Sequence, residues 1–444
     1  MNEQTWNRIQ GGIYGMLVGD ALGVPYEFQE SAEIPDLDLI EFHPPADFRR
    51  SHEGVPPGTW SDDGAQALCL LASLLECGKL DQADYAQRLV DWYNQGYMAI
   101  DQKVFDVGVT TASSIRCLMN GISPENSGAT GDYDNGNGSL MRVLPLALWH
   151  RGSDEDLVES AHRQSHITHA HMRSKVCCAL YCLWARNILR EDSEPWANAL
   201  ENLRRIYVGN PQATYELEWS VRPEQFEEGS GSGYVVDSLR TAFVIQKSPS
   251  FEAIVKAAVK IGNDTDTTAC IAGGIAGLRF GMRSIPTRWI EDLRGKEIVE
   301  DLLGRLRKVL EKTNGPSYRI DTPGSQAFSA SVQSLAGALL AKYGLRQVGP
   351  VQDHGSDPKG AGRLYLAFYE APGYFLKIRT TDGAVEVLTG ASSAPLDWSD
   401  LDAGEKRAWF WPSDSESETG VVKISSQDLL ELRDNLSDGH VGWV

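Results

Sequence analysis

Two rows of glycine, each repeating at every fourth residue, constrain the fold of this chain more than any other feature. The glycines of these rows are Gly11, Gly15, Gly19, Gly23, Gly273, Gly277 and Gly281. A spacing of four residues places each row on one face of a helix. A glycine destabilises a helix by about 1 kcal/mol relative to alanine, so a whole row indicates a compensating close approach between two backbones. The sequence therefore predicts two tightly packed helices, although glycines that serve packing alone, with no functional site nearby, stay an open alternative.

An acidic motif stands beside each glycine row, at the point where a predicted helix begins. The two motifs, GTWSDDG and GNDTDTT, contain Ser61, Asp62, Asp63, Asp264, Asp266 and Thr267. The first glycine row also leads into Asp20 and Glu27. Close packing of the two helices would bring these acidic ends together.

Metal binding and helix capping are the two interpretations of the acidic motifs. Carboxylates and hydroxyls are hard oxygen donors, which suit Mg²⁺, Mn²⁺ or Ca²⁺ better than zinc. Short polar residues also cap helices, because their oxygens accept hydrogen bonds from the free N–H groups of a first turn. Capping accounts for one oxygen per helix and leaves the second carboxylate beside a like charge, which a cation would offset. We expect a shared metal site, with capping alone as the alternative.

Composition limits the class of protein. A chain of 444 residues with 42% hydrophobic and 23% charged residues is typical of a soluble globular protein with more than one domain. A formal net charge of -20 argues against nucleic acids and anionic membranes as partners. No signal peptide is visible in MNEQTWNRIQ, and the apolar stretch at 269–278 is too short to span a membrane. Seven cysteines without a C-x-x-C motif predict a reduced, cytoplasmic protein.

Helical periodicity dominates the chain up to about Thr313. Apolar residues recur at three- and four-residue spacing in segments 65–76, 85–93, 139–150, 172–190, 234–246 and 254–261. Strand-like alternation is nearly absent there. The pattern predicts an all-α, multi-helix domain over residues 1–315.

The sequence changes character after Asn314-Gly315-Pro316. A linker is predicted at 316–324, and a smaller α+β domain of unknown role at 325–444. Its predicted elements are a helix at 326–343 and strands at 363–369, 374–379, 384–388 and 421–424.

The order of the motifs resembles one known family. The chain contains GGIYGMLVGDALGVPYEF, GTWSDDGAQALCLLASL, NGSLMRVLPLAL, SHITHAH, GSGYVVDSL and GNDTDTTACIAGGIAGL, in that order. In these motifs, residues 6–310 resemble the ADP-ribosylglycohydrolase family. The resemblance implies an all-α fold that holds two Mg²⁺ or Mn²⁺ ions. It also implies cleavage of the N- or O-glycosidic bond between ADP-ribose and an acceptor, which is a protein side chain or a small molecule.

The same resemblance implies a set of metal ligands. They fall on Ser61, Asp62, Asp63, Asp264, Asp266 and Thr267, together with Glu27. One departure is visible, because Gly64 follows the first aspartate pair where many members of the family have threonine. Loss of that hydroxyl leaves the coordination by the first motif open.

Cleavage of a ribosyl bond also needs a group that transfers a proton. The reaction passes through an oxocarbenium-like state, and two metals can hold the ribose hydroxyls and lower the pKa of a water. Glu27 and Asp106 are the candidate catalytic carboxylates, and the resemblance places Asp106 beside the substrate ribose. The sequence alone leaves open which of them is the base, and Asp106 could instead cap a helix at 107–119.

A second set of residues is expected to contact the ADP-ribose. The start of a helix after NGNGS would offer backbone N–H groups to the diphosphate. The resemblance adds two histidines and a tyrosine near the nucleotide, although the tyrosine could instead be a core aromatic residue. The whole predicted set is Asn137, Gly138, Ser139, Met141, Arg142, His166, His169 and Tyr234.

Two alternatives stay open at this point. Four histidines, His162, His166, His169 and His171, precede two cysteines and could form a zinc site, although their spacing matches no standard zinc module. The chain could also be a noncatalytic ADP-ribose or nucleotide binding protein, if Ser61 and Gly64 mark a decayed site. Retention of the four motif aspartates and Glu27 favours the hydrolase, and the acceptor is not fixed by the sequence.

Overall fold

The structure is a computed structural model that describes residues 1–226 and 229–312 and five strands between residues 346 and 391. The chain divides into two compact units, Met1–Lys312 and Thr313–Val444.

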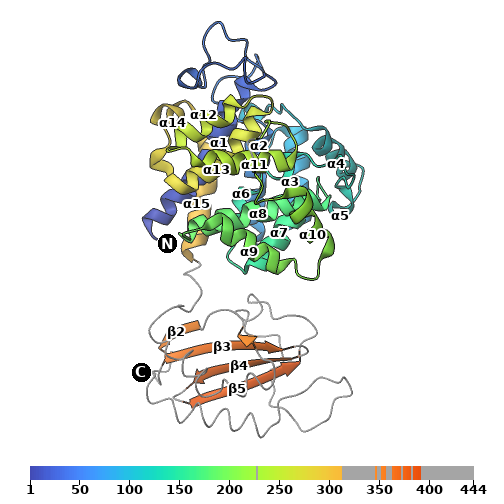
Figure 1. Cartoon of the computed structure of the whole chain (residues 1–444), viewed down its shortest axis with the longest axis vertical. Helices are drawn as coiled ribbons and strands as arrows, with labels where there is room; N and C mark the ends of the chain where they lie inside the picture. The colour runs from blue at the N-terminus through green and yellow to red at the C-terminus, as the bar shows by residue number, and fades with distance from the viewer. Residues whose placement is uncertain are drawn as a thin grey trace. The chain divides into compact units, whose positions relative to one another are not determined.

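The first unit is a bundle of helices (Figure 1). Residues 1–226 and 229–312 contain no strand, in agreement with the predicted all-α domain. Its α-helices are α1 Glu3–Gly23, α2 Asp62–Cys77, α3 Gln82–Gln95, α4 Val109–Met119, α5 Pro124–Ser127, α6 Leu144–Trp149, α7 Asp154–His166, α8 Met172–Leu189, α9 Pro195–Ile206, α10 Pro211–Tyr215, α11 Val235–Val244, α12 Phe251–Lys260, α13 Thr265–Phe280, α14 Thr287–Asp292 and α15 Lys296–Lys312.

Local sequence signals set the ends of several helices. Asp81 accepts hydrogen bonds from two backbone N–H groups at the start of α3, and Ser153 forms a capping box with Asp156 at the start of α7. Gly78 and Gly96 end α2 and α3 in the left-handed conformation, which glycine adopts without steric strain. These signals hold the helices in a defined register around the apolar core.

The two glycine rows meet along α1 and α13, which lie side by side (Figure 1). A Cβ atom on Gly15 would overlap the carbonyl oxygen of Gly273, and one on Gly11 would overlap that of Gly277. At the other end of the contact, a Cβ atom on Gly23 would overlap the backbone of Asp266. The helices are therefore antiparallel and in backbone contact, as the rows predict, and the end of α1 meets the start of α13.

One predicted helix is shorter than expected. The sequence pattern predicts a helix over 139–150, whereas α6 begins at Leu144 and a short 3₁₀ turn occupies Asn137–Ser139. Pro145 explains the difference, because proline lacks an N–H group and fits only the first turn of a helix. Residues 140–143, between the 3₁₀ turn and α6, belong to neither element.

The second unit contains five described strands in one antiparallel sheet. They are β1 Arg346–Gln347, β2 Gln352–Ser356, β3 Arg363–Ala371, β4 Tyr374–Thr381 and β5 Ala384–Ala391. The strand order is β1-β3-β4-β5, and β2 also pairs with β3. Three predicted strands coincide with β3, β4 and β5, whereas the predicted linker, the helix at 326–343 and the strand at 421–424 lie outside the described residues. The α+β assignment therefore stays a prediction.

No helix among the described residues combines the length and apolarity that crossing a membrane requires. All seven cysteines are free, and five of them are buried, as expected for cysteines that fill core positions.

Candidate active site

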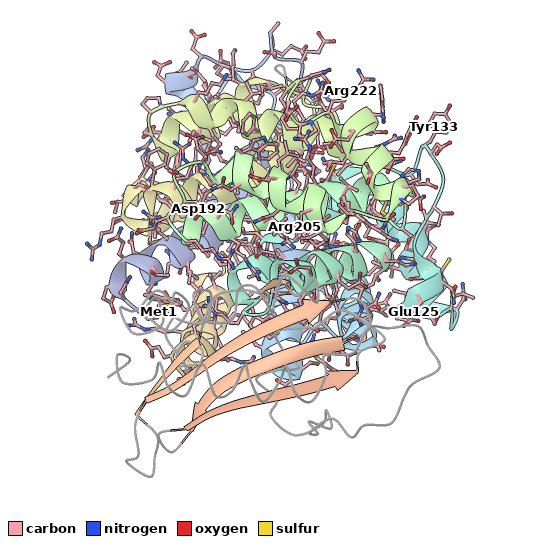
Figure 2. The ribbon with its side chains drawn as sticks, turned by 60° about the horizontal axis from the view of Figure 1, so that its bottom comes forward. Met1, Glu125, Tyr133, Asp192, Arg205 and Arg222 are labelled. Carbon is pink, nitrogen blue, oxygen red and sulfur yellow. The ribbon has the colours of Figure 1, made fainter. Side chains whose placement is uncertain are left out.

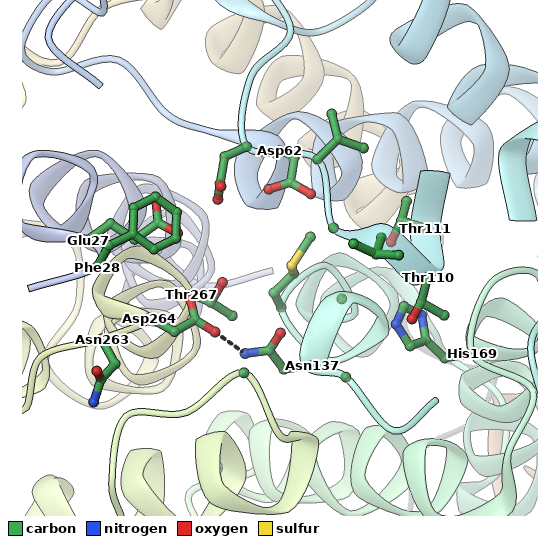
Figure 3. Close-up of a pocket in the computed structure, with 18 of the residues that line it drawn as sticks. Glu27, Phe28, Asp62, Thr110, Thr111, Asn137, His169, Asn263, Asp264 and Thr267 are labelled. Atoms are coloured by element: carbon green, nitrogen blue, oxygen red, sulfur yellow. Dashed lines mark hydrogen bonds between the residues drawn. The ribbon is translucent and has the colours of Figure 1, made fainter. Parts of the chain in front are cut away.

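A cavity of about 650 Å³ opens where three helix ends meet. The end of α1 and the starts of α2 and α13 supply acidic side chains to one side of it. We call this side the carboxylate wall; Glu27, Asp62, Asp106 and Asp264 line the cavity, and Asp20, Asp63 and Asp266 are buried beside them. The opposite side, which we call the turn wall, comprises Gly136, Asn137, Gly138, Met141 and His169. Figure 3 shows Glu27, Asp62 and Asp264 on one side of the cavity and His169 on the other.

Asp20 organises the start of α2. Its two carboxylate oxygens accept hydrogen bonds from the backbone N–H groups of Ser61 and Gly64, each at 2.8 Å. Asp20 is fully buried, so it caps α2 from the neighbouring helix. The first glycine row predicts that Asp20 lies near the other acidic motif, but it gives no sign of these hydrogen bonds to α2.

Because the Ser61 hydroxyl is the N-cap of α2, accepting from the Asp63 N–H, and Asp20 accepts from two further N–H groups, the aspartates of the first motif are free for another role. Gln66 donates a hydrogen bond to Asp62 Oδ2 at 2.8 Å, and Thr267 donates one to Asp63 Oδ1 at 3.2 Å. At the start of α13, the side chain of Asp264 accepts no capping hydrogen bond. Capping alone therefore does not account for the paired carboxylates.

The two motifs converge on Asp266. Carboxylate oxygens of Asp20, Asp63 and Asp266 lie within 4.8 Å of one another, and those of Glu27, Asp264 and Asp266 do the same. Asp266 Oδ2 is buried and has no hydrogen-bond partner among the described residues. A buried carboxylate oxygen without a donor is unfavourable unless a cation binds it. The oxygen donors of these two groups fit a hard divalent cation such as Mg²⁺ or Mn²⁺.

Burial and mutual repulsion raise the pKa values of the carboxylate wall. Burial, followed by the negative charges of Asp106, Asp264 and Asp62, raises the pKa of Glu27 to about 10. Burial likewise raises the pKa of Asp20 to about 7, although the hydrogen bonds that it accepts from the backbone N–H groups of Ser61 and Gly64 lower it. The pKa values of Asp62, Asp63 and Asp266 are raised well above the usual range, also mainly by burial. Bound cations would supply the positive charge that stabilises these groups in their ionised form.

Glu27 and Asp106 form a third acidic group with His52. The distance from His52 Nε2 to Glu27 Oε2 is 2.6 Å, and the three side chains lie within 4.8 Å of one another. The sequence offered no signal for His52, which lies in an irregular segment just before the first acidic motif and outside it. Asp106 lines the cavity and does not cap α4, because the residue before that helix is Gly108. The capping alternative for Asp106 is therefore wrong.

Asn137 connects the two walls. Its side-chain amide donates to Asp264 Oδ2 at 2.7 Å, drawn as a dashed line in Figure 3, and to Ser238 Oγ at 2.9 Å. Its neighbours Gly138 and Met141 also line the cavity. These three predicted binding residues lie together.

Ser139 and Arg142 do not reach the cavity. Both are fully buried. Ser139 Oγ accepts from Ser165 at 2.8 Å, and Arg142 Nη1 donates to Gln66 Oε1 at 2.7 Å. The short turn and the delayed start of α6 direct these side chains into the core.

The two predicted histidines occupy different environments. His169 lines the cavity and is 2% exposed, and burial lowers its pKa to about 3, so its imidazole is neutral. His166 instead contacts the backbone carbonyl of Glu125, at 3.0 Å, and Glu125 lies on the outer surface of the helical unit (Figure 2). None of the four clustered histidines belongs to a group with metal-binding geometry in the described residues, so the structure does not support the zinc alternative.

Tyr234 precedes α11 and is not among the residues that line the cavity. Its side chain is 38% exposed, so it is not a core aromatic residue. The guanidinium of Arg173 lies 6.0 Å from the centre of its ring.

Close packing leaves no room for a side chain at Gly64. A Cβ atom there would lie 2.7 Å from a methyl group of Leu17, 2.9 Å from the ring of Trp60 and 3.0 Å from Asp20 Oδ2. A threonine at this position would displace these neighbours, which explains the departure from the family pattern in steric terms.

The helical unit is similar to known proteins. The family model for ADP-ribosylglycohydrolase matches residues 1–316. The chain belongs to the ADP-ribosylglycohydrolase family. A solved structure described as an ADP-ribosylglycohydrolase-related protein complex is similar, with a TM-score of 0.56 and 28% identity over 69% of this chain and 99% of the other. The helical unit therefore has the fold of this family.

Several relatives of this ADP-ribosylglycohydrolase family member are named for a hydrolytic activity. An ADP-ribosylarginine hydrolase, Tri1, from Pseudomonas putida is 30% identical over 68% of this chain and 79% of its own length. The ADP-ribosyl-[dinitrogen reductase] glycohydrolase of Rhodospirillum rubrum is 29% identical over 65% and 90%. The human ADP-ribosylhydrolase ARH3 is 25% identical over 70% and 95%.

Proposed function

We propose that this chain hydrolyses the glycosidic bond between ADP-ribose and an acceptor, with two divalent cations, Mg²⁺ or Mn²⁺, held by the carboxylate wall. The observation that carries the proposal is the convergence of two acidic motifs on one edge of one cavity. The hydrogen bond between Thr267 and Asp63 joins these motifs directly. Buried like charges destabilise a fold, so their convergence indicates a functional role.

The relatives support the class of substrate. Their names include hydrolases of ADP-ribosylarginine and of ADP-ribosylated dinitrogen reductase. We therefore propose an ADP-ribosylated protein as the substrate, with arginine as the first acceptor to test, and small ADP-ribose conjugates as further candidates.

The proposed division of labour within the site follows its geometry. The residues proposed to hold the cations are Ser61, Asp62, Asp63, Asp264, Asp266 and Thr267. Bound cations would orient the ribose hydroxyls and lower the pKa of the attacking water. Glu27 and Asp106 border the cavity from the same side, with carboxylate oxygens within 4.8 Å of each other, so they are the groups proposed to move a proton between water and the leaving acceptor. His52 fixes the orientation of Glu27 through the 2.6 Å contact.

The turn wall is proposed to bind the ADP-ribose. Asn137, Gly138, Met141 and His169 face the cavity, and the glycines leave the backbone open to close approach by a ligand. Asn137 is held by Asp264 and Ser238, so its orientation is linked to the carboxylate wall. Ser139, Arg142 and His166 are given no direct contact with substrate.

A turnover assay tests the proposal. An ADP-ribosylarginine peptide, an ADP-ribosylserine peptide and O-acetyl-ADP-ribose would each be incubated with the full chain and with Mg²⁺, Mn²⁺ or a chelator. We expect release of ADP-ribose from at least one substrate with metal and none with chelator. Binding of ADP-ribose without turnover of any substrate would favour the noncatalytic alternative, and full turnover with chelator would exclude the metal mechanism.

A further inference from the structure

Arg142 is a fully buried arginine in the core between the two walls. No carboxylate among the described residues forms an ion pair with it. Its guanidinium lies 5.5 Å from the centre of the Tyr85 ring and donates to three neutral side chains, those of Gln66, Thr168 and Gln164. Burying a charged group among neutral groups lowers the stability of the fold, so the position of Arg142 indicates a role beyond packing.

The first chain of hydrogen bonds runs to the carboxylate wall. Arg142 Nη1 donates to Gln66 Oε1 at 2.7 Å, and Gln66 Nε2 donates to Asp62 Oδ2 at 2.8 Å. A guanidinium can only donate, so the oxygen of the Gln66 amide must face Arg142. The amide nitrogen is then turned toward Asp62, and the carboxylate receives a donor rather than a repelling oxygen.

The second chain runs to the turn wall. Arg142 Nη2 donates to Thr168 Oγ1 at 2.7 Å, and Thr168 Oγ1 lies 2.8 Å from His169 Nδ1. The hydroxyl has one proton, and the guanidinium cannot accept it, so within the described contacts the proton goes to His169 Nδ1. The neutral imidazole then carries its own proton on Nε2.

The Nε2 edge of His169 faces the glycines of the turn wall. A Cβ atom on Gly136 would lie 3.5 Å from Nε2, and one on Gly138 would lie 3.4 Å from it. Gln164, which also contacts Arg142, donates to the carbonyl oxygen of Ser139, the residue after Gly138. The same guanidinium thus supports the histidine and the turn beside it.

We propose that Arg142 is a positioning residue that orients both hydrogen-bond chains outward, so that Gln66 presents N–H to Asp62 and His169 presents Nε2–H to a ligand in the cavity. This inference rests on the proposed function for the identity of the ligands, a divalent cation and ADP-ribose. Lysine would not replace Arg142, because its single ammonium lacks the planar fork that reaches both partners.

The test compares one variant that breaks both chains with two that break one each. Arg142→Met removes the shared donor, Gln66→Met breaks the chain to Asp62, and Thr168→Val breaks the chain to His169. The measurements are Mn²⁺ and ADP-ribose affinities by calorimetry and the tautomer of His169 by ¹⁵N NMR of the metal-free, ligand-free protein. Substituting a residue that forms a hydrogen bond to a metal ligand typically lowers the affinity of the site for the metal by about 10- to 100-fold.

We expect Gln66→Met to lower the affinity for Mn²⁺ by about tenfold. Its affinity for ADP-ribose in the absence of metal should change little. Thr168→Val should lower the affinity for ADP-ribose by about fivefold to tenfold and leave the affinity for Mn²⁺ unchanged. In this variant His169 should no longer be purely in the Nε2–H tautomer. Arg142→Met should show both losses. Thr168→Ser, which keeps the hydroxyl, should restore wild-type values.

Arg186→Met is the matched control. Arg186 is also buried, but it pairs with Asp154 far from the cavity. We expect it to lower stability and to leave both affinities and the tautomer unchanged. The proposal is overturned if a folded Arg142→Met keeps both affinities within twofold. If that variant does not fold, an unchanged tautomer in Thr168→Val overturns it instead. A wild-type chain that binds neither Mn²⁺ nor ADP-ribose would refute the proposed function, while the tautomer would still test the orientation of His169.

Discussion

The two walls of the cavity are built on opposite principles. The carboxylate wall gathers like charges, and Asp266 Oδ2 there has no hydrogen-bond partner among the described residues. The turn wall is neutral, and the hydrogen bonds of Asn137 and His169 are directed by their neighbours. A bound cation would therefore stabilise the first wall, whereas the polar groups of the second wall already have hydrogen-bond partners. Substitutions on the two walls should fail in different ways.

The largest effect is expected from Asp62→Asn and Asp266→Asn, on the carboxylate wall. Each should lower turnover by about 10³-fold or more and weaken Mn²⁺ binding, because both motifs are proposed to hold one cation pair. Asparagine keeps the shape of aspartate but not its charge, so the metal-free variants should be as stable as wild type or more so. Turnover, metal affinity and melting temperature would be measured together.

Asp301→Asn is a suitable control for these variants, because Asp301 is an exposed aspartate on α15. Near-normal turnover in either site variant would overturn the shared-site assignment.

The next effect concerns pH and metal. The raised pKa values of Asp20, about 7, and Glu27, about 10, mean that the folded state keeps protons that the unfolded chain releases near pH 4. The free energy of unfolding of the metal-free protein should therefore fall as pH rises from about 5 to 8, by about 1.4 kcal/mol per pH unit for each such proton, with the contribution of Asp20 ending near pH 7 and that of Glu27 continuing beyond it.

Saturating Mn²⁺ should raise the melting temperature most at the high end of this range, because it binds the ionised carboxylates. Chemical denaturation with chelator and with Mn²⁺ at several pH values checks this. A metal-free stability that rises with pH over the same window would contradict the assigned pKa shifts.

A smaller effect separates two histidines that the sequence does not distinguish. His169→Ala should raise the KM for an ADP-ribosylated peptide by about tenfold, because it removes a buried donor on the turn wall. His166→Ala should change turnover by less than about twofold, since His166 contacts the backbone carbonyl of Glu125 and does not line the cavity. Steady-state kinetics on both variants would check this, and equal losses would show that the ligand reaches further than the turn wall.

The smallest effect is expected from removing the second unit. A chain that ends at Gly315 should keep turnover within about twofold on a small ADP-ribose conjugate, because all the cavity residues lie before Lys312. Soluble expression and turnover of this shortened chain are the measurements. An insoluble or inactive product would show that the proposed division of the chain is incorrect.

The carboxylate wall could be predicted from the sequence more completely than the turn wall. Its chemistry lies in contiguous motifs at helix ends, and the glycine rows reveal which helices meet. The place of Asp20 in the acidic cluster was predicted, but its hydrogen bonds to the start of α2 were not, because they depend on where α2 begins in space. His52 was missed because it reaches Glu27 from a segment without any motif.

The turn wall depends on the direction of single side chains. The pattern 139–150 has helical periodicity, but Pro145 delays the helix, and the turn before it sends Ser139 and Arg142 into the core. Periodicity gives the type of an element more reliably than its ends, and here the ends decide which residues face the cavity.

The backbone contact between α1 and α13 also has a consequence for biosynthesis. The ribosome synthesises Gly11 long before Gly277, so α13, the partner of α1, does not exist while most of the helical unit is being made. Contacts between residues so distant in sequence form slowly, because a long loop must close first. Chains released early from the ribosome would carry the first acidic motif and never the second. A cation that binds both motifs would therefore select only chains completed past α13, and its binding would mark the end of folding rather than its beginning.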